Sequence, residues 1–170
     1  MIFVPYDRNA AVRYAHIWAY GRNPRFYDYE SIGGDCTNFA SQCLYAGSLT
    51  MDYTPTYGWF YIDANRKAPA WTGVVYLYNY LTRTRAAPGP AAYDASVDDI
   101  EPGDLVQLSF DGIQWAHTPV IVSAGEKRSY DSILVAAHSY DADYRPLSSY
   151  DFSLIRFLHI TGVYKQSLQW

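Results

Sequence analysis

Apolar residues in the first half of the chain recur at the three- and four-residue spacing of amphipathic helices. Each stretch follows a residue suited to a helix N-terminus, namely Asp7, Asp35 or Thr72. Gly21 and Gly47 interrupt the first two patterns, as glycine commonly does just past the end of a helix. The pattern predicts three helices, over residues 8–20, 36–46 and 73–84.

The second half of the chain changes to alternating runs of β-branched and aromatic residues, separated by turn signals such as Asp111-Gly112. Residues 50–71, before the third helix, are rich in proline, glycine and aromatic side chains without a sustained period, which predicts a long ordered loop. This order predicts an α+β fold in which N-terminal helices pack on one side of a C-terminal antiparallel sheet. The predicted strands cover residues 104–110, 114–123, 132–140 and 154–164.

The composition is typical of a single folded domain, residues 1–170. Apolar residues make up 49% of the chain and charged residues 18%, so a core can form without disulfides or a metal. The formal net charge is -4 and no basic stripe is present, which argues against nucleic acid and acidic membranes as partners. No apolar run is long enough for a membrane span or a signal peptide, so we expect a cytoplasmic protein.

The two cysteines, Cys36 and Cys43, need separate explanations. On one helix their Cα atoms lie roughly 10 Å apart, which excludes a disulfide and predicts two free thiols in a reducing compartment. Cys36 falls in the first turn, where the helix dipole is expected to lower the thiol pKa and favour a nucleophile. Cys43 falls among apolar neighbours and is expected to pack as a small hydrophobe. By position alone, Cys36 fits the packing role equally well.

A thiol nucleophile needs a proton acceptor, and histidine is the usual one near neutral pH. His16 and His159 are expected to be packed or solvated. His117 opens one predicted strand and His138 closes the next, so a hairpin centred on the connecting loop pairs them directly. Their Cβ atoms would then lie roughly 5 Å apart on one face, close enough for one imidazole to orient the other. A different register would separate them.

Several stretches, in this order and spacing, closely resemble the bacterial putative amidase domain family, and the resemblance covers nearly the whole chain. It implies a papain-like fold related to the NlpC-type and CHAP cysteine hydrolases. It also implies Cys36 as nucleophile, His117 as general base and His138 as the orienting third residue, with Asp141 as the alternative. The stretches are YDRNAAVRYAHIWA, RNPRFYDYESIGGDCTNFASQCLYAG, APAWTGVVYLYNYL, EPGDLVQL, HTPVIV and AAHSYDADYRPLSSY.

The resemblance therefore implies hydrolysis of an amide bond through an acyl-enzyme, with no metal or cofactor. The backbone N–H of Cys36 is one oxyanion donor, while the glutamine that precedes the cysteine in papain-like enzymes is missing here. The aromatic loop would wall a cleft or simply fill gaps beneath the sheet. The candidate substrate-contacting residues are Tyr29, Ser31, Asp35, Trp59 and Trp71.

Two other functions compete with this interpretation. A zinc site built from both cysteines with His117 and His138 is disfavoured, because cysteines two turns apart on a helix do not reach one ion through Zn–S bonds of roughly 2.3 Å. A catalytically inactive papain-like module that binds a ligand through the aromatic loop is the main alternative. For the enzyme, the expected substrate is a small peptide or a peptidoglycan-derived amide. The oligomeric state does not follow from the sequence.

Overall fold

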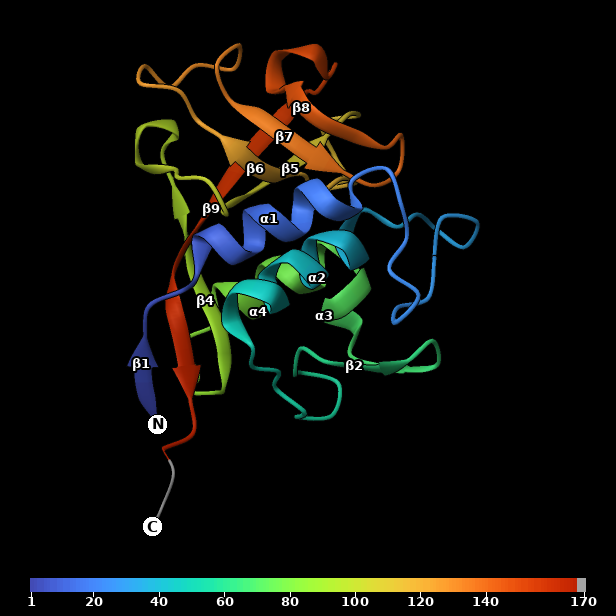
Figure 1. The fold of residues 1–170 in the computed structure, drawn as a ribbon, viewed down its shortest axis with the longest axis vertical. Coiled ribbons are helices and arrows are strands. Elements are labelled where there is room, and N and C mark those ends of the chain that lie inside the picture. Colours follow the sequence, from blue (N-terminus) through green and yellow to red (C-terminus); the bar gives the residue numbers. More distant parts are fainter. Residues whose placement is uncertain (168–170) are drawn as a thin grey trace.

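The computed structural model describes residues 1–167 and has an α+β architecture (Figure 1). Over these residues, no helix is both long and apolar enough to cross a membrane. The helices are α1 (Arg8–Trp18), α2 (Cys36–Ser48), α3 (Pro69–Thr72) and α4 (Val74–Leu81), with short 3₁₀ helices η1 (Val97–Asp99) and η2 (Leu147–Ser149). The strands are β1 (Ile2–Val4), β2 (Tyr61–Asp63), β3 (Arg66–Lys67), β4 (Gly89–Ala95), β5 (Leu105–Ser109), β6 (Val120–Ser123), β7 (Leu134–Ala137), β8 (Ala142–Pro146) and β9 (Leu154–Lys165).

The main sheet has the strand order β1-β9-β5-β6-β7-β8, and every neighbouring pair is antiparallel. The long strand β9 pairs with β5 along its first part and with β1 along its last, while β4 pairs along its other edge. The helices lie together against the sheet, and the β2-β3 hairpin extends beyond them (Figure 1). The predicted α+β class, with helices packed against an antiparallel sheet, is therefore confirmed.

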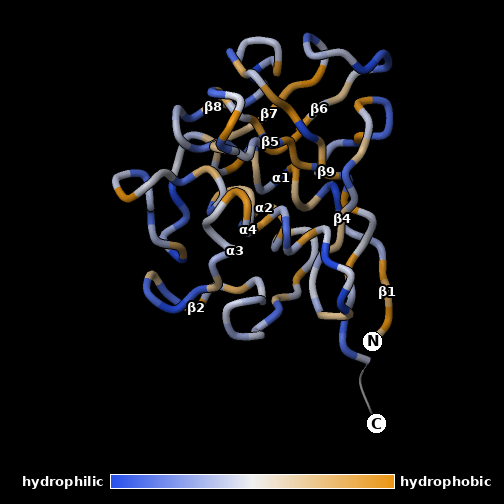
Figure 2. Tube along the Cα trace, turned by 180° about the vertical axis from the view of Figure 1, so that it is seen from behind, coloured by the Kyte–Doolittle hydropathy of each residue, from blue (hydrophilic) through white to orange (hydrophobic). Residues whose placement is uncertain are grey.

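Two apolar clusters pack against the sheet because alternate residues of each strand point to opposite faces. Leu105 and Val120 belong to the cluster that includes the helices, whereas Val106 and Ile121 belong to the second one. Apolar segments accordingly gather in the strands and the neighbouring helices, and polar segments occupy the outer loops (Figure 2). Each large aliphatic side chain buried in this way contributes roughly 1.5–3 kcal/mol relative to exposure.

The first two helices begin where the sequence predicts. The Asp7 carboxylate accepts a 2.9 Å hydrogen bond from the N–H of Ala10, and Asp35 is the N-cap residue of α2. The predicted end of α2 at Gly47 is wrong, because the helix continues to Ser48 and stops at Leu49, whose φ is 51°. Gly47 instead allows the ring of Tyr6 to approach, since a Cβ at this position would collide with it.

The third predicted helix is shorter than expected, because Thr72 closes α3 and the N-cap of α4 is Gly73. The four predicted strands are present as β5, β6, β7 and β9, although β6 begins only at Val120. The sequence did not predict β1, β4 and β8, nor the hairpin and short helix within residues 50–71. Strand β4 reads GPAAYDA and lacks the β-branched residues that signal a strand.

Candidate active site

Cys36 lies at the first position of α2, where the backbone N–H has no partner within the helix. The chain reaches this position through Gly33 and Gly34, whose φ angles of 89° and 99° suit glycine. The thiol is 7% exposed, and its Sγ lies 3.7 Å from the Thr37 hydroxyl. The helix start therefore presents a nearly buried thiol.

The same thiol packs beside the segment that carries His117. Its Sγ lies 4.0 Å from the carbonyl oxygen of Ala116, and the N–H of Thr118 also points toward it. The Thr37 and Thr118 hydroxyls are 3.2 Å apart, which ties the helix start to this segment. On its other edge the segment bonds to β5 through the bridge between His117 and Leu108. The structure thus brings the segments of the two candidate catalytic residues, Cys36 and His117, together.

His117 is 6% exposed, and its Nε2 atom is buried without a hydrogen-bond partner among residues 1–167. Aromatic rings flank the imidazole, with the centroid of Tyr150 at 5.4 Å and that of Phe110 at 6.3 Å. Burial lowers the pKa of His117 from 6.5 to about 4, and the positive charge of Arg145 adds to the effect. At neutral pH the ring is therefore uncharged and able to accept a proton.

The expected low pKa of the Cys36 thiol is not supported by its surroundings. Burial raises this pKa and Asp35 adds to the rise, while the Thr37 hydroxyl and the backbone N–H groups of Thr118 and Thr37 only partly counter it. Desolvation disfavours the thiolate more than these hydrogen bonds favour it. The two candidate groups are consequently a neutral thiol and a neutral imidazole, rather than a preformed ion pair.

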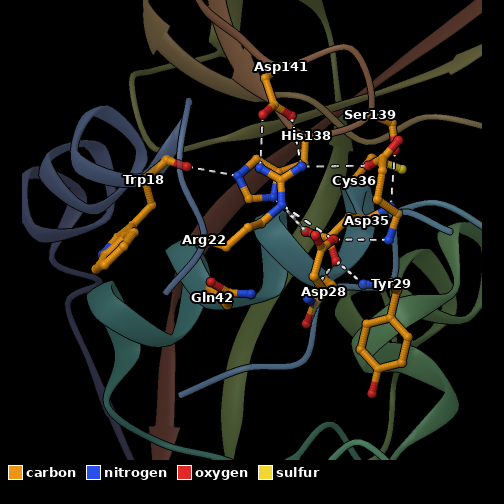
Figure 3. Close-up of polar contacts among 12 residues, drawn as sticks. Trp18, Arg22, Asp28, Tyr29, Asp35, Cys36, Gln42, His138, Ser139 and Asp141 are labelled. Carbon is orange, nitrogen blue, oxygen red and sulfur yellow. Dashed lines mark hydrogen bonds and ion pairs between the residues drawn. The ribbon is translucent and has the colours of Figure 1, made fainter. Parts of the chain in front are cut away.

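The predicted pairing of His117 with His138 is wrong. Strands β6 and β7 pair Val120 with Ala136 and Ile121 with Val135, which is shifted by one residue from the register that would place the two histidines opposite each other. His138 instead bonds through Nδ1 to Asp35 Oδ2 at 2.5 Å and through Nε2 to the carbonyl oxygen of Trp18 at 2.8 Å (Figure 3). Both ring nitrogens are occupied, so neither is available to orient His117.

Asp35 lies at the centre of this second cluster and is 0% exposed. Its Oδ1 accepts hydrogen bonds from the Tyr29 N–H and the Asn38 side-chain amide, both at 2.8 Å. Arg22 lies 3.7 Å from Oδ2, and the same guanidinium donates to Asp141 at 2.9 Å (Figure 3). The prediction that Asp35 contacts substrate is therefore wrong, and Asp141 pairs with Arg22 rather than orienting His117.

The remaining substrate-contacting candidates lie away from the thiol or inside the core. Trp59 and Trp71 are both 0% exposed, with ring centroids 4.9 Å apart, so they fill the core and do not wall a cleft. The Tyr29 hydroxyl donates to the carbonyl oxygen of Ala64 at 2.8 Å and is not free to serve as an oxyanion donor. Ser31 lies in an exposed turn.

A cavity of about 510 Å³ opens next to His117. Ala116, Ser139, Arg145 and Tyr150 are among the residues that line it. The Tyr150 hydroxyl is buried and makes no well-formed hydrogen bond in the part of the chain that the structure describes, although the Arg145 guanidinium lies near enough to lower its pKa. Burial raises the pKa of Tyr150, the Arg145 guanidinium partly counters this rise, and the Cys36 thiol adds a smaller one, so the phenol lies within the electrostatic reach of the thiol.

Comparison with known proteins identifies the family. Residues 5–160 match the family model described as Putative amidase domain. The chain belongs to this family. Over 142 residues it is 32% identical to Uncharacterized protein YhbB of Bacillus subtilis (strain 168), an alignment that covers 82% of this chain and 43% of the relative. The chain thus spans less than half of that protein's length, and no solved structure matches it.

The family name of the amidase domain suggests an amide hydrolase. Tyr150 and Arg145 were missed by the sequence analysis, although both fall in or next to the stretch AAHSYDADYRPLSSY that carries the resemblance. A tyrosine among eighteen offers little signal by itself. Only the fold shows that the residues after β8 return to His117 and Cys36.

Proposed function

We propose that this amidase domain hydrolyses an amide bond in a small peptide or a peptidoglycan-derived substrate, with Cys36 as nucleophile and His117 as general base. The observation that carries the proposal is the packing of the thiol against both neighbours of His117, beside a cavity that the imidazole lines. In apo structures, catalytic hydrogen bonds are often long and tighten when substrate binds. The arrangement therefore supports a thiol and base that meet during the reaction.

The pKa directions keep the proton on the thiol before the attack, so its transfer to His117 must accompany the formation of the bond to carbon. As Sγ bonds to the amide carbonyl carbon, its proton passes to the uncharged His117. The imidazolium then donates that proton to the amide nitrogen as the C–N bond breaks, which leaves a thioester on Cys36. Water, deprotonated by His117, hydrolyses the thioester and restores the thiol. Because the pKa of His117 is about 4, its imidazolium is a strong acid and readily protonates the leaving nitrogen.

The oxyanion that forms during the attack needs preorganised donors. The N–H of Cys36, unpaired at the start of α2, supplies one. We assign the second to the Tyr150 hydroxyl, which is buried, makes no well-formed hydrogen bond and lies within the electrostatic reach of the thiol. This assignment replaces Tyr29 and Ser31, the two donors considered from the sequence.

A papain-like relationship is part of the same proposal. A cysteine at the start of a helix, packed on an antiparallel sheet beside a histidine that precedes the next strand, supports descent from the NlpC-type and CHAP hydrolases. The third residue departs from that pattern, since His138 bonds to Asp35 and Trp18. We propose that His138 acts as a structural residue that anchors the start of α2.

The competing functions receive less support. The inactive module would use the aromatic loop, yet its two tryptophans are buried in the core. Among residues 1–167, no group of three or more cysteine, histidine or acidic side chains is arranged to hold a metal ion. Cys43, at 0% exposure, belongs to the helical core cluster rather than to the site.

The first experiment is the pH dependence of iodoacetamide alkylation at Cys36, resolved from Cys43 by peptide mass spectrometry. With His117 as its base, Cys36 should stay reactive down to about pH 4, where the imidazole becomes protonated. In His117→Ala the rate should instead rise about tenfold per pH unit with the thiolate fraction. Identical profiles for the two proteins would refute the Cys–His pair.

Turnover needs a separate measurement. Short peptides and peptidoglycan fragments, incubated with the native protein and with Cys36→Ala, can be followed by mass spectrometry for products that have gained water. Cleavage that disappears in Cys36→Ala supports hydrolysis. Cleavage that persists in the variant would exclude Cys36 as nucleophile, and a reactive Cys36 without any cleavage would favour the binding module.

A further inference from the structure

Arg145, on strand β8, places a positive charge in the wall of the cavity beside His117. Within the described part of the chain, no carboxylate oxygen lies within 4.0 Å of its guanidinium. Two acidic residues of the same hairpin are already neutralised, since Asp141 pairs with Arg22 and Asp143 with His16. Asp151 also lines the cavity but forms no ion pair with Arg145, so among the described residues the guanidinium has no carboxylate in direct contact.

The guanidinium is held rigidly along one side. Its Nε donates to the Ser149 hydroxyl at 2.7 Å and its Nη2 donates to the Ser149 carbonyl at 3.2 Å. Its central carbon lies 3.7 Å from the centroid of the Tyr150 ring, a close cation–π contact. These contacts occupy Nε and one Nη2 hydrogen, and apart from a weaker interaction with the Tyr150 hydroxyl the remaining N–H groups make no hydrogen bond to residues 1–167. A guanidinium has five N–H groups, so donors remain available for a ligand.

We propose that Arg145 binds a carboxylate of the substrate, so that the preferred substrate is a peptide whose carboxylate lies close to the scissile amide. This inference rests on the proposed amide hydrolysis and names its substrate class. A planar guanidinium matches a carboxylate through paired hydrogen bonds, and stacking on Tyr150 orients it before the ligand arrives. A cavity of about 510 Å³ also lies within the usual size of ligand sites.

Binding of a carboxylate at Arg145 would also raise the pKa of His117. The charge of Arg145 is one of the two causes that lower the pKa of His117. A bound carboxylate offsets this charge, so the imidazole becomes a stronger proton acceptor once substrate is in place. Peptides without the carboxylate would leave His117 as weak as it is in the free protein.

The test compares two alkylating reagents that differ in charge, iodoacetate and iodoacetamide. The rate of each at Cys36 is measured by peptide mass spectrometry, and the ratio of the two rates cancels any change in the intrinsic reactivity of the thiol. We expect the rate with iodoacetate divided by the rate with iodoacetamide to fall about tenfold in Arg145→Gln, in line with the loss of a charge-assisted contact. The same ratio should be largely retained in Arg145→Lys. Arg13→Gln, which removes the same charge from an exposed part of α1, should keep the native ratio.

A ratio that is equal in the native protein and Arg145→Gln would overturn the carboxylate site while leaving a reactive Cys36 intact. If Cys36 reacts with neither reagent faster than an ordinary thiol, the nucleophile proposal fails, and binding alone decides the inference. Calorimetry on Cys36→Ala then compares N-acetyl-alanyl-alanine with its C-terminal amide and with N-acetyl-alanyl-glutamyl amide. Tighter binding of the first or the last probe, lost in Arg145→Gln, supports a C-terminal or a side-chain carboxylate respectively. Equal binding of all three overturns the site.

Discussion

His117 and His138 lie at the same end of adjacent strands, yet their surroundings differ in almost every physical respect. His138 is 1% exposed, has a partner for each ring nitrogen and stacks on Phe39 at a centroid distance of 4.0 Å. His117 is nearly as buried, but its Nε2 has no partner and its ring borders a cavity. Similar burial thus accompanies one satisfied ring and one unsatisfied ring.

The difference separates structural from chemical roles. A carbonyl oxygen only accepts, so Nε2 of His138 must carry a hydrogen for Trp18, while Nδ1 bonds to the buried Asp35 carboxyl group. That pair joins the end of α1, the cap of α2 and the end of β7. A buried nitrogen without a partner, as in His117, costs free energy that a structural role does not explain. Such a cost is expected where a group must exchange protons with a substrate.

Removing each imidazole should give the largest contrast. In His138→Ala, Asp35 stays buried without its main partner, and we expect a loss of about 3–5 kcal/mol in the free energy of unfolding. His117→Ala should cost clearly less, because Nε2 has no hydrogen bond to lose. Urea unfolding of both variants near neutral pH, followed by tryptophan fluorescence, measures this difference. Equal losses would show that His117 is also a structural residue.

Acid should weaken the protein through His117. Its pKa is 6.5 when unfolded and about 4 when folded, so the unfolded chain binds the proton first as the pH falls. Stability is then fully present above about pH 6.5 and declines toward pH 4, by roughly 3 kcal/mol in total. His117→Asn should lose less stability than the native protein across this window. The free energy of unfolding of both proteins is measured with urea at each pH. An equal loss in both proteins between about pH 6.5 and pH 4 would contradict a buried neutral imidazole.

The sequence predicts features that depend on residues close together in the chain better than features that depend on distant ones. Helix periodicity and the Asp7 cap are local, and they located α1 and the start of α2. Strand β1 is only three residues long, and strands β4 and β8 carry no β-branched residue, so they were not recognised; all three pair with the edges that β9 and β7 offer. Local signals predicted the fold class but not the full sheet.

The candidate site shows the same division. Helix position and the family resemblance led to Cys36 and His117, whose segments do pack together. The role of His138 was missed because its partners Asp35 and Trp18 lie 103 and 120 residues away, and the loop between β6 and β7 does not determine the register. The pKa of Cys36 was misjudged because burial, a property of the folded chain, raises it more than the hydrogen bonds around the thiol lower it. The cavity with Tyr150 and Arg145 is likewise tertiary.

Tyr150 resembles His117 in that its polar atom is buried beside the cavity without a well-formed hydrogen bond. Because its hydroxyl makes no well-formed hydrogen bond, Tyr150→Phe should change the free energy of unfolding by less than about 0.5 kcal/mol. As an oxyanion donor, however, its loss should lower kcat/KM for a cleaved peptide roughly a hundredfold. Tyr140→Phe is the matched control, since Tyr140 lines the same cavity but is 91% exposed. Equal rates for the two variants would remove Tyr150 from the oxyanion site.

Ser139 contacts both the structural cluster around Asp35 and the cavity beside His117, and its substitution has the smallest expected effect. Its hydroxyl accepts a 3.0 Å hydrogen bond from the N–H of Asp35 and donates to Glu30 at 3.1 Å, while the residue also lines the cavity. If the hydroxyl only ties β7 to the cap of α2, Ser139→Ala should lower the free energy of unfolding by about 1 kcal/mol and change kcat/KM only a few-fold.

Ser139→Gly separates that tie from backbone strain. Ser139 has a φ of 61°, a conformation that costs roughly 1–2 kcal/mol for residues with a Cβ. Glycine removes the same hydroxyl but relieves this strain, so Ser139→Gly should be more stable than Ser139→Ala and close to the native protein in urea unfolding. A large fall in kcat/KM in both variants, with stability intact, would instead place the Ser139 hydroxyl among the groups that contact substrate. His138 would then be a structural residue, whereas its neighbour Ser139 would belong, like His117, to the site that contacts substrate.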